Sequence, residues 1–308
     1  MSAGPEPGVV AMVRDQPGGP AWLAALPRLV ADLARDWELT LGPPWLDGMA
    51  SWTAPAVDRM GRRAVLKVSW PHDEAAGEAA ALRHWDGNGA VRLLRHDPDR
   101  WALLLERCEP GTALRDHRAG DDAKLTVGAA LLQRLWDMSP DPPLPTELAP
   151  RLVEVSGAWA AFVEQRAAAS AVRLDRPLVA LAADLLRTLP ADAEREVLLH
   201  GDANPGNVLR AGQRWVVIDP KPMVGDPAYD PWPLLVQVGD PFDAPDPRGR
   251  LRARYAAFGE LARLPPSRLV AWSVARTVRM ALWEDERGRA ADAATSLRRA
   301  RLLADLLG

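Results

Sequence analysis

Residues 198–209 constrain this chain more than any other stretch of it. They read LLHGDANPGNVL, and a second apolar run, WVVI at residues 215–218, leads directly into Asp219. Apolar runs on both sides of a polar turn predict two buried strands joined as a hairpin. Such a hairpin brings Asn207 and Asp219 to one edge of a sheet, a short distance along the chain from Asp202.

This order of polar residues is typical of phosphoryl transfer. A kinase uses one Asp to accept or orient the substrate hydroxyl, an Asn five residues later to hold a metal ion, and a second Asp at a strand end to hold Mg²⁺. Asp202, Asn207 and Asp219 occur in that order. We therefore predict Asp202 as the catalytic residue and the other two as metal ligands. The alternative is a plain turn, which Gly, Asp, Asn and Pro also favour, but a turn does not require all three positions.

Composition narrows the class of partner. The net charge is -3 and no block of Lys or Arg occurs, so a general nucleic-acid binder is disfavoured and a small-molecule partner is expected. Cys108 is the only cysteine, which excludes an intramolecular disulfide and gives no sign of an oxidising compartment. Residues 1–19 lack a signal peptide's apolar segment, and no later run is long enough to span a membrane. We expect a cytoplasmic protein without a membrane partner, and no pattern fixes its oligomeric state.

The chain divides by pattern into three parts. Residues 1–20 are rich in Gly and Pro and are expected to be a mobile leader. Residues 21–107 combine an amphipathic helix with short strand patterns, and residues 108–308 are helical in pattern apart from the catalytic segment. The predicted fold class is α+β. We expect two lobes, a small N-terminal lobe with an antiparallel sheet and a larger, mainly helical C-terminal lobe.

Lys67 is the candidate phosphate-binding residue of the first lobe. It lies on the predicted strand at residues 63–68 and is one of only three lysines in the chain. A kinase places a lysine there and holds it with a glutamate from a helix. Helical phase favours Glu78 over Glu74, because Glu78 shares a face with the apolar residues of the predicted helix at 71–85. The alternatives are an edge-strand lysine with its ammonium in water and a surface glutamate.

Further nucleotide contacts are indicated less sharply. Residues 48–51 read GMAS, and their backbone amides with the Ser51 hydroxyl are candidates to bind phosphate; a plain hairpin turn is an equal alternative. Glu106 and Cys108 follow a predicted strand where a hinge would offer backbone hydrogen bonds to adenine. Cys108 is better interpreted as a packed residue than as a nucleophile, because no histidine flanks it.

Three residues around the catalytic segment are interpreted as structural, and a fourth, Lys221, is left open. His200 is interpreted as a packed, hydrogen-bonded loop residue. Asp226 is expected to hydrogen-bond loop amides and Asp230 to start a helix. Lys221 would reach either a phosphate or solvent, and the pattern does not decide between them.

Together these residues resemble the aminoglycoside phosphotransferase superfamily of small-molecule kinases, whose motifs read HGDxHxxN and IDP or IDF. Within it, residues 218–230, residues 87–94 and the LLLER run at 103–107 are similar to the branch of streptomycin 6-phosphotransferases and hydroxyurea kinases. One departure is Asn204, where relatives commonly have His. We expect this departure to change the packing of the loop only.

The resemblance implies a bilobal protein-kinase-like fold, ATP and Mg²⁺ as cofactors, and a hydroxyl acceptor. It implies Lys67 on the phosphates with Glu78 as its partner, Asp202 as base, and Asn207 and Asp219 as metal ligands. It also points to an antibiotic of the streptomycin type as acceptor, inactivated by phosphorylation. Because such an acceptor is cationic, Glu284 and Asp285 near the end of a C-terminal helix are candidate substrate carboxylates; a solvated acidic helix end is the equal alternative.

Other functions stay open at the level of the sequence. The same chemistry would serve hydroxyurea, a sugar or an amino sugar as acceptor. A nucleotide-binding pseudokinase is a further alternative from a different class. Retention of Lys67, Asp202, Asn207 and Asp219 counts against it, because a protein without catalysis would be free to lose at least one of them.

Overall fold

The computed structural model describes residues 7–45, 50–138, 144–170 and 174–308. The chain forms two compact units. Unit 1 comprises Met1–Gly111 and Arg210–Val216, and unit 2 comprises Thr112–Leu209 and Val217–Gly308. The sequence pattern predicted a single boundary between the lobes, at residue 108. In the structure the hairpin at residues 210–216 also belongs to unit 1. Its amide at Gly212 donates to the Glu109 carbonyl at 2.6 Å, which ties this hairpin to the end of the first segment.

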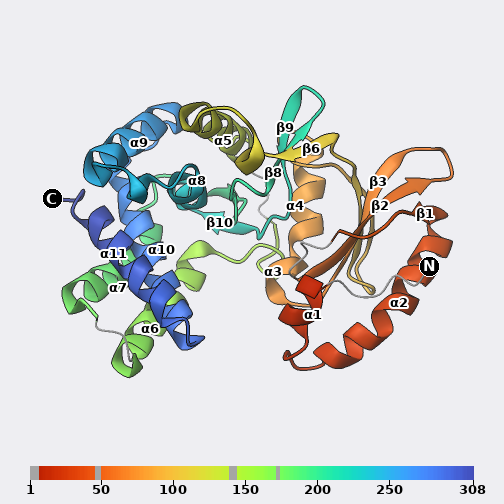
Figure 1. The fold of residues 1–308 in the computed structure, drawn as a ribbon, viewed down its shortest axis with the longest axis horizontal. Helices are drawn as coiled ribbons and strands as arrows, with labels where there is room; N and C mark the ends of the chain where they lie inside the picture. Colours follow the sequence, from red (N-terminus) through yellow and green to blue (C-terminus); the bar gives the residue numbers. More distant parts are fainter. Residues whose placement is uncertain (1–6, 46–49, 139–143, 171–173) are drawn as a thin grey trace. The chain divides into compact units, whose positions relative to one another are not determined.

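Unit 1 is built on an antiparallel sheet of five strands in the order β1-β2-β3-β5-β4. Figure 1 labels the first three of them, β1, β2 and β3. Along β3 the side chains alternate between the two faces of the sheet. Leu66 and Val68 are buried beneath helix α2 (Gly19–Asp36), and Lys67 therefore belongs to the opposite face. The strands are β1 (Leu39–Leu41), β2 (Ser51–Asp58), β3 (Arg63–Ser69), β4 (Leu93–Asp97) and β5 (Ala102–Glu106).

The predicted helix at 71–85 is interrupted. It consists of a single turn, α3 (Asp73–Ala76), and of α4 (Glu78–Trp85), with Gly77 between them. Glycine is the weakest helix former after proline, which accounts for the break at this position. As a result Glu78 is the first residue of α4, and its side chain is buried together with Leu82 and Trp85.

The expected mobile leader contains ordered structure. Helix α1 spans Pro7–Val13, and α2 begins at Gly19, within the segment assigned to the leader. Val9 and Val13 lie four residues apart, on one helical face, and both are buried. The Gly and Pro residues around them concealed this short apolar face, so the leader interpretation is wrong for residues 7–20.

Unit 2 is mainly helical, and α10 lies at its centre. Residues 269–278 of α10 are all buried, which is the pattern of a helix enclosed by others. It packs against α6, α7, α9 and α11. The helices are α5 (Asp121–Trp136), α6 (Leu152–Ala169), α7 (Arg176–Ala191), α8 (Trp232–Gln237), α9 (Pro247–Ala262), α10 (Pro266–Glu286) and α11 (Ala290–Ala304).

Short strands and turns carry the polar segments. Strand β7 (Val197–Leu199) pairs antiparallel with β10 (Met223–Gly225). The two ends of the segment between these strands therefore lie side by side. Strands β6 (Pro110–Ala113), β8 (Val208–Ala211) and β9 (Arg214–Val217) form a sheet in the order β6-β8-β9. The described residues also form the 3-10 turns η1 (Leu114–Asp116), η2 (Pro227–Tyr229) and η3 (Pro241–Asp243).

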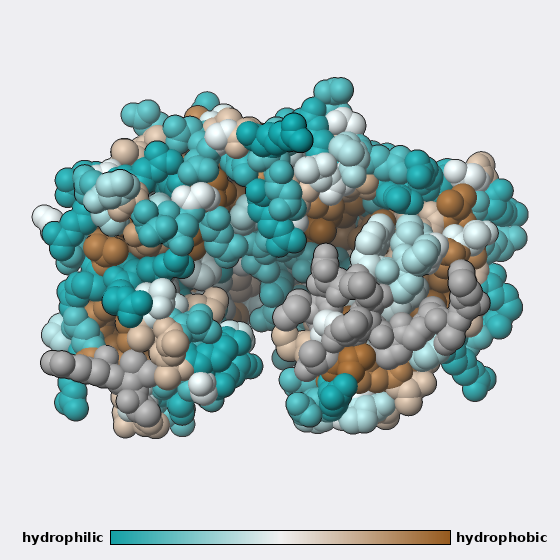
Figure 2. Space-filling model, in the orientation of Figure 1, coloured by the Kyte–Doolittle hydropathy of each residue, from teal (hydrophilic) through white to brown (hydrophobic). Residues whose placement is uncertain are grey.

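Among the described residues, every helix is too short or too polar to cross a bilayer. The face drawn in Figure 2 is mostly hydrophilic, with hydrophobic side chains in small separate patches.

The packing of Leu66 in the core of unit 1 predicts how much stability is lost when this side chain is shortened. Replacing Leu66 by Ala should lower the free energy of unfolding by about 2–5 kcal/mol, because it opens a cavity between the sheet and α2. The half-exposed Val57 on neighbouring β2 is the control, and Val57→Ala should change the same quantity by less than about 0.5 kcal/mol. Denaturant unfolding measures both. Equal effects would contradict this packing.

Candidate active site

Lys67 and Glu78 form a buried ion pair in unit 1. The Lys67 Nζ donates to both carboxylate oxygens of Glu78, at 2.7 and 2.6 Å. The two residues are only 6% and 2% exposed. Taking two charges out of water is costly, so such a pair is retained where it holds a charge in one position. The structure joins Lys67 to Glu78, the glutamate that helical phase favoured over Glu74; the role of both residues toward nucleotide phosphate stays a prediction.

The other nucleotide candidates of unit 1 have partners within the protein. The Ser51 hydroxyl lies 2.9 Å from that of Ser69, and residues 48 and 49 of the candidate phosphate loop lie outside the described residues. Glu106 ends β5, where its carboxylate accepts from the Arg214 guanidinium at 2.6 Å. Contacts to adenine by the backbone around Glu106 and Cys108 stay a prediction.

The catalytic segment of unit 2 is held by the buried carboxylate of Asp230. One of its oxygens accepts from the amide of Gly201 at 2.8 Å. The other accepts from the amide of His200 and from the indole N–H of Trp136, both at 2.9 Å. Three donors on one carboxylate fix the two residues that precede Asp202. Sequence reasoning assigned Asp230 to the start of a helix and missed this function.

Gly201 allows two chain segments to meet beside Asp202. Its φ is +81°, and a Cβ at this position would lie 2.0 Å from the carbonyl oxygen of Lys221. The amide of Lys221 in turn donates to the His200 carbonyl at 2.8 Å. Only glycine combines this dihedral angle with this close approach. The motif therefore needs Gly201 for the backbone, while the catalytic role of the neighbouring Asp202 stays a prediction.

The Asp202 carboxylate faces one amide and one cation. Its Oδ1 accepts from the Asn204 side chain at 3.2 Å, and its Oδ2 lies 3.5 Å from the Lys221 Nζ. The sequence left open whether Lys221 reaches a phosphate or solvent; the structure places it beside Asp202. Asn204 also accepts from the amides of Gly206 and Asn207, so this departure from the family motif orders the loop.

Asn207 and Asp219 are brought together by the strand pairing. The Ile218 amide donates to the Asn207 carbonyl at 2.9 Å, which places Asp219 beside Asn207. The Asn207 side-chain amide donates to the Asp202 carbonyl at 3.0 Å, so its amide oxygen is oriented as an acceptor. Asp219 has a φ of +58°, a conformation that non-glycine residues rarely adopt and that occurs at functional sites.

This donor set fits Mg²⁺. The ion prefers hard oxygen ligands and usually takes one or two from the protein, with the rest from substrate phosphates and water. One Asn oxygen and one carboxylate meet that need. Groups of three or more metal-binding side chains do not occur among the described residues. A Mg²⁺ ion that takes most of its ligands from phosphates and water does not require such a group.

His200 is a structural residue of this loop. Its Nε2 lies 3.0 Å from the Ile218 carbonyl oxygen, so this nitrogen must carry the proton and donate. Its Nδ1 then accepts from the amide of Asp202 at 3.2 Å. Burial lowers the pKa of His200, against the opposing charges of Asp230 and Asp202. A neutral ring with both nitrogens engaged agrees with the packed loop residue that the sequence predicted.

Asp226 and the two acidic candidates of α10 are likewise engaged. Asp226 accepts from its own turn at Ala228, as expected, and also from Arg268 and Trp272 of α10. Glu284 accepts from the Ser296 hydroxyl at 2.8 Å. Asp285 is 8% exposed and lies 3.5 Å from Arg166. These contacts hold helices together, and a role of Glu284 or Asp285 toward a substrate stays a prediction.

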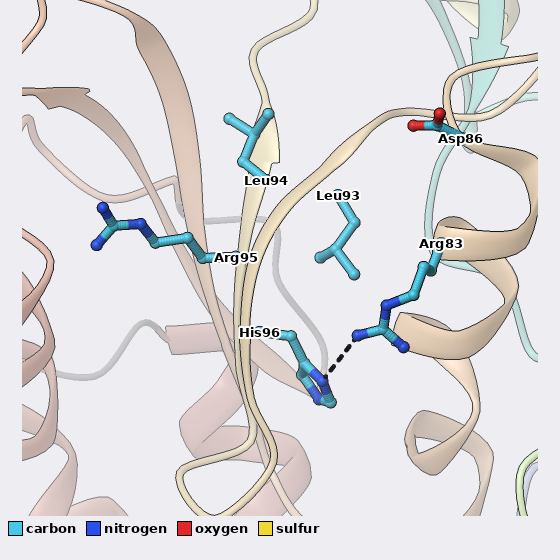
Figure 3. A pocket seen from close by; sticks show the side chains of 6 residues that line it. All are labelled: Arg83, Asp86, Leu93, Leu94, Arg95 and His96. Atoms are coloured by element: carbon cyan, nitrogen blue, oxygen red, sulfur yellow. Dashed lines mark hydrogen bonds between the residues drawn. The ribbon is translucent and has the colours of Figure 1, made fainter.

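A surface hollow of about 430 Å³ on unit 1 contains none of these residues. Arg83 and His96 reach toward each other across it, 3.4 Å apart, with Leu93 between the strand and the helix (Figure 3). Burial and the nearby Arg83 lower the pKa of His96. The hollow therefore offers no candidate nucleophile or metal ligand set. It is lined by Arg83, Asp86, Leu93, Leu94, Arg95 and His96.

The antiparallel sheet with its buried Lys67–Glu78 pair and the Asp202 loop of the helical unit are features of a protein-kinase-like phosphotransferase. The structure is similar to that of a thermostable mutant of the aminoglycoside phosphotransferase APH(4)-Ia in ternary complex with ADP and hygromycin B. The TM-score is 0.58 at 19% identity, over 90% of this chain and 98% of that chain. This likeness confirms the predicted α+β fold, with an antiparallel sheet followed by a helical part.

The sequence comparisons define the family. A model of the aminoglycoside/hydroxyurea antibiotic resistance kinases matches residues 37–288, and the chain belongs to this family of small-molecule kinases. It is 38% identical to a streptomycin 6-kinase of Streptomyces glaucescens, over 89% of this chain and 87% of that protein. It is 37% identical to a hydroxyurea phosphotransferase of Kitasatospora aureofaciens, over 89% and 77% respectively. The predicted family and enzyme class are confirmed.

The Asp230 contacts predict a selective defect. Asp230→Asn keeps the shape of the side chain but replaces one acceptor oxygen by a donor, which leaves a buried N–H unsatisfied. We expect the free energy of unfolding to fall by about 1–3 kcal/mol and turnover to fall at least about tenfold, because Asp202 is displaced. Thermal unfolding and steady-state kinetics measure the two effects. Asp292→Asn, at a surface ion pair, is the control, and an unaffected Asp230→Asn enzyme would contradict the assignment.

Cys108 should react slowly. Burial and the neighbouring Glu106 raise the pKa of its thiol to about 11, although Arg214 opposes the shift. Because the thiolate is the reactive form, alkylation by iodoacetamide at pH 8 should be roughly 100-fold slower than for a free thiol, and should accelerate as the pH approaches 11. Unfolding in guanidinium should restore the rate for this single cysteine. Fast alkylation of the folded protein at pH 8 would show the thiol to be open to solvent.

Proposed function

We propose that this chain transfers the γ-phosphoryl group of ATP, with Mg²⁺, to a hydroxyl of a small molecule. The observation that carries the proposal is the loop of unit 2. There the Asn207 side-chain amide donates to the Asp202 carbonyl, and the Ile218 amide donates to the Asn207 carbonyl and so brings Asp219 alongside; Asp230 and Gly201 hold the loop in place. The family match supports the same reaction class.

The proposed roles follow from the chemistry of each group. Lys67, held by Glu78, binds nucleotide phosphate; the ADP complex of the solved relative supports ATP as donor. Asn207 and Asp219 hold Mg²⁺, which when bound neutralises charge on the phosphates.

Asp202 orients the acceptor hydroxyl and receives its proton. The acceptor oxygen forms a bond to the γ-phosphorus while the bond from that phosphorus to the β–γ bridging oxygen breaks, and ADP leaves. Lys221, 3.5 Å from Asp202, supplies a fixed positive charge beside the proton acceptor.

Two acceptor classes come from the relatives. The sequence favoured an aminoglycoside of the streptomycin type, and two streptomycin 6-kinases, at 38% and 35% identity, support it. The hydroxyurea phosphotransferase at 37% identity supports hydroxyurea equally well. The carboxylates expected for a cationic acceptor, Glu284 and Asp285, have partners inside the protein, which removes one argument for streptomycin. Sugars and amino sugars complete the set of candidates.

An acceptor panel tests the proposal. ADP release is measured with ATP, Mg²⁺ and streptomycin, other aminoglycosides, hydroxyurea or amino sugars. We expect at least one acceptor to stimulate release, and Asp202→Ala to reduce it by at least about 10²-fold, the usual contribution of a positioned general base. The control is Asp116→Ala, an exposed carboxylate of the same unit. Acceptor-dependent release that survives Asp202→Ala would refute the mechanism.

The metal assignment has its own test. Asp219→Asn should abolish Mg²⁺-dependent turnover, because it removes the charged ligand, while the circular dichroism spectrum stays that of the folded protein. Titration of Mg²⁺ separates weaker binding from loss of chemistry. Full activity of Asp219→Asn at the Mg²⁺ concentration that half-saturates the wild type would show that the metal is held elsewhere.

A further inference from the structure

The η2 turn of unit 2 is attached to one face of helix α10. The Arg268 Nε and the Trp272 indole N–H both donate to the Asp226 carboxylate, at 2.7 and 2.5 Å. The Arg276 Nη1 donates to the Tyr229 carbonyl oxygen at 2.8 Å. The three donors are spaced four residues apart on α10, so they lie along one face of the helix. This face therefore holds the turn that leads into the carboxylate on which the catalytic loop depends.

Arg276 is enclosed by the aromatic rings that flank Asp230 in the chain. Its guanidinium lies 3.9 Å from the centroid of the Tyr229 ring and 4.5 Å from that of Trp232. A cation over an aromatic face is attracted by the ring, and Arg276 is only 5% exposed. The Trp232 indole N–H in turn donates to the hydroxyl of Thr277, the next residue of α10, at 3.0 Å. One side chain thus contacts the chain both before and after Asp230.

The hydrogen bond from Arg276 fixes the peptide unit that carries Asp230. The Tyr229 carbonyl and the Asp230 amide belong to one planar group, so holding one end sets the orientation of the other. The Asp230 amide donates to the Pro227 carbonyl at 3.3 Å. Both ends of this peptide are therefore engaged, and they set the direction in which the Asp230 side chain leaves the backbone.

Asp230 passes this constraint to the catalytic loop. Its carboxylate accepts from the amides of His200 and Gly201, which directly precede Asp202. Burial lowers the pKa of Arg276, and the carboxylates of Asp202 and Asp230 are among the groups that oppose this shift. The Arg276 charge therefore acts on the carboxylate that holds the loop and on the one that the loop presents.

We propose that Arg276 is a positioning residue for phosphoryl transfer. It holds the peptide before Asp230, Asp230 holds the loop, and the loop presents Asp202. This inference rests on the proposed function, in which Asp202 orients the acceptor hydroxyl. Because the proposed phosphate ligand Lys67 belongs to unit 1, loss of Arg276 should lower turnover and leave the binding of ATP unchanged.

Steady-state kinetics of Arg276→Met, with streptomycin and with hydroxyurea as acceptors, tests the inference. Methionine keeps a long apolar side chain between the two rings but removes the charge and the donor to Tyr229. We expect kcat to fall at least about tenfold, because Asp202 loses its alignment, and the KM for ATP to stay within about twofold. Arg276→Lys keeps a cation and a donor, and should recover at least about threefold of the lost kcat.

Arg254→Met is the matched control. Arg254 is a buried arginine of the same unit, 4% exposed, and it donates to the carbonyls of Leu235 and Val238 at the end of α8. Both Met variants remove a buried guanidinium, so both should lower the Tm, by about 3–12 °C. Arg254→Met should nevertheless keep kcat per folded molecule within about twofold.

Equal losses of kcat in the two Met variants would overturn the inference, because they would show a general effect of removing a buried arginine. Arg276→Lys with a kcat as low as that of Arg276→Met would overturn it as well. If a Met variant does not fold, Arg276→Lys and Arg254→Lys carry the test, and only Arg276→Lys should have a lower kcat than the wild type.

Hydrogen exchange separates this inference from the proposed function, because it reports on the loop without turnover. The amides of His200 and Gly201 should exchange at least about tenfold faster in Arg276→Met than in Arg254→Met. Such exchange in a protein whose wild type phosphorylates no acceptor would support the positioning of the loop and contradict the proposed function. Turnover with an unchanged kcat in Arg276→Met would overturn the inference and leave the function standing.

Discussion

The buried carboxylate of Asp230 is the interaction on which the catalytic segment depends. A loop between two short strands has few contacts of its own, and its backbone amides need partners if they are withdrawn from water. Asp230 supplies those partners to His200 and Gly201, and the indole of Trp136 completes its hydrogen bonds. One charge thus joins the end of α5, the catalytic loop and the turn before α8. The loop then presents the Asp202 carboxylate, whose Oδ1 accepts from Asn204 and whose Oδ2 lies beside Lys221.

Other polar side chains near the loop also hydrogen-bond to backbone groups. His200 uses both ring nitrogens on backbone groups, and Asn204 closes the turn that leads to Asn207. In unit 1 the Lys67–Glu78 pair is buried to a degree that stability alone does not favour. The polar side chains of the catalytic loop named here thus have hydrogen-bond partners within the protein.

Local patterns predicted much of this arrangement. The Lys67–Glu78 pair follows from strand alternation and helical phase, and the residues of the catalytic loop follow from their spacing. Asp230 could not be assigned in this way, because its contacts join residues about 30 positions apart and an Asp before Pro231 and Trp232 is equally typical of a helix start. The Arg279 guanidinium of α10 lies 4.4 Å from the centroid of the Trp159 ring of α6. Helical periodicity cannot show which faces of distant helices meet in this way. Helix α1 was missed because its apolar face is only two valines long.

We propose that the Asp202 loop moves a phosphoryl group onto a hydroxyl of a small acceptor. The decisive measurement is mass spectrometry of the acceptor after incubation with the enzyme, ATP and Mg²⁺, together with ³¹P NMR of the same mixture. We expect an acceptor that carries one phosphoryl group bound through oxygen, formed in equal amount to ADP. ADP and free phosphate with an unmodified acceptor, across streptomycin and hydroxyurea alike, would contradict it.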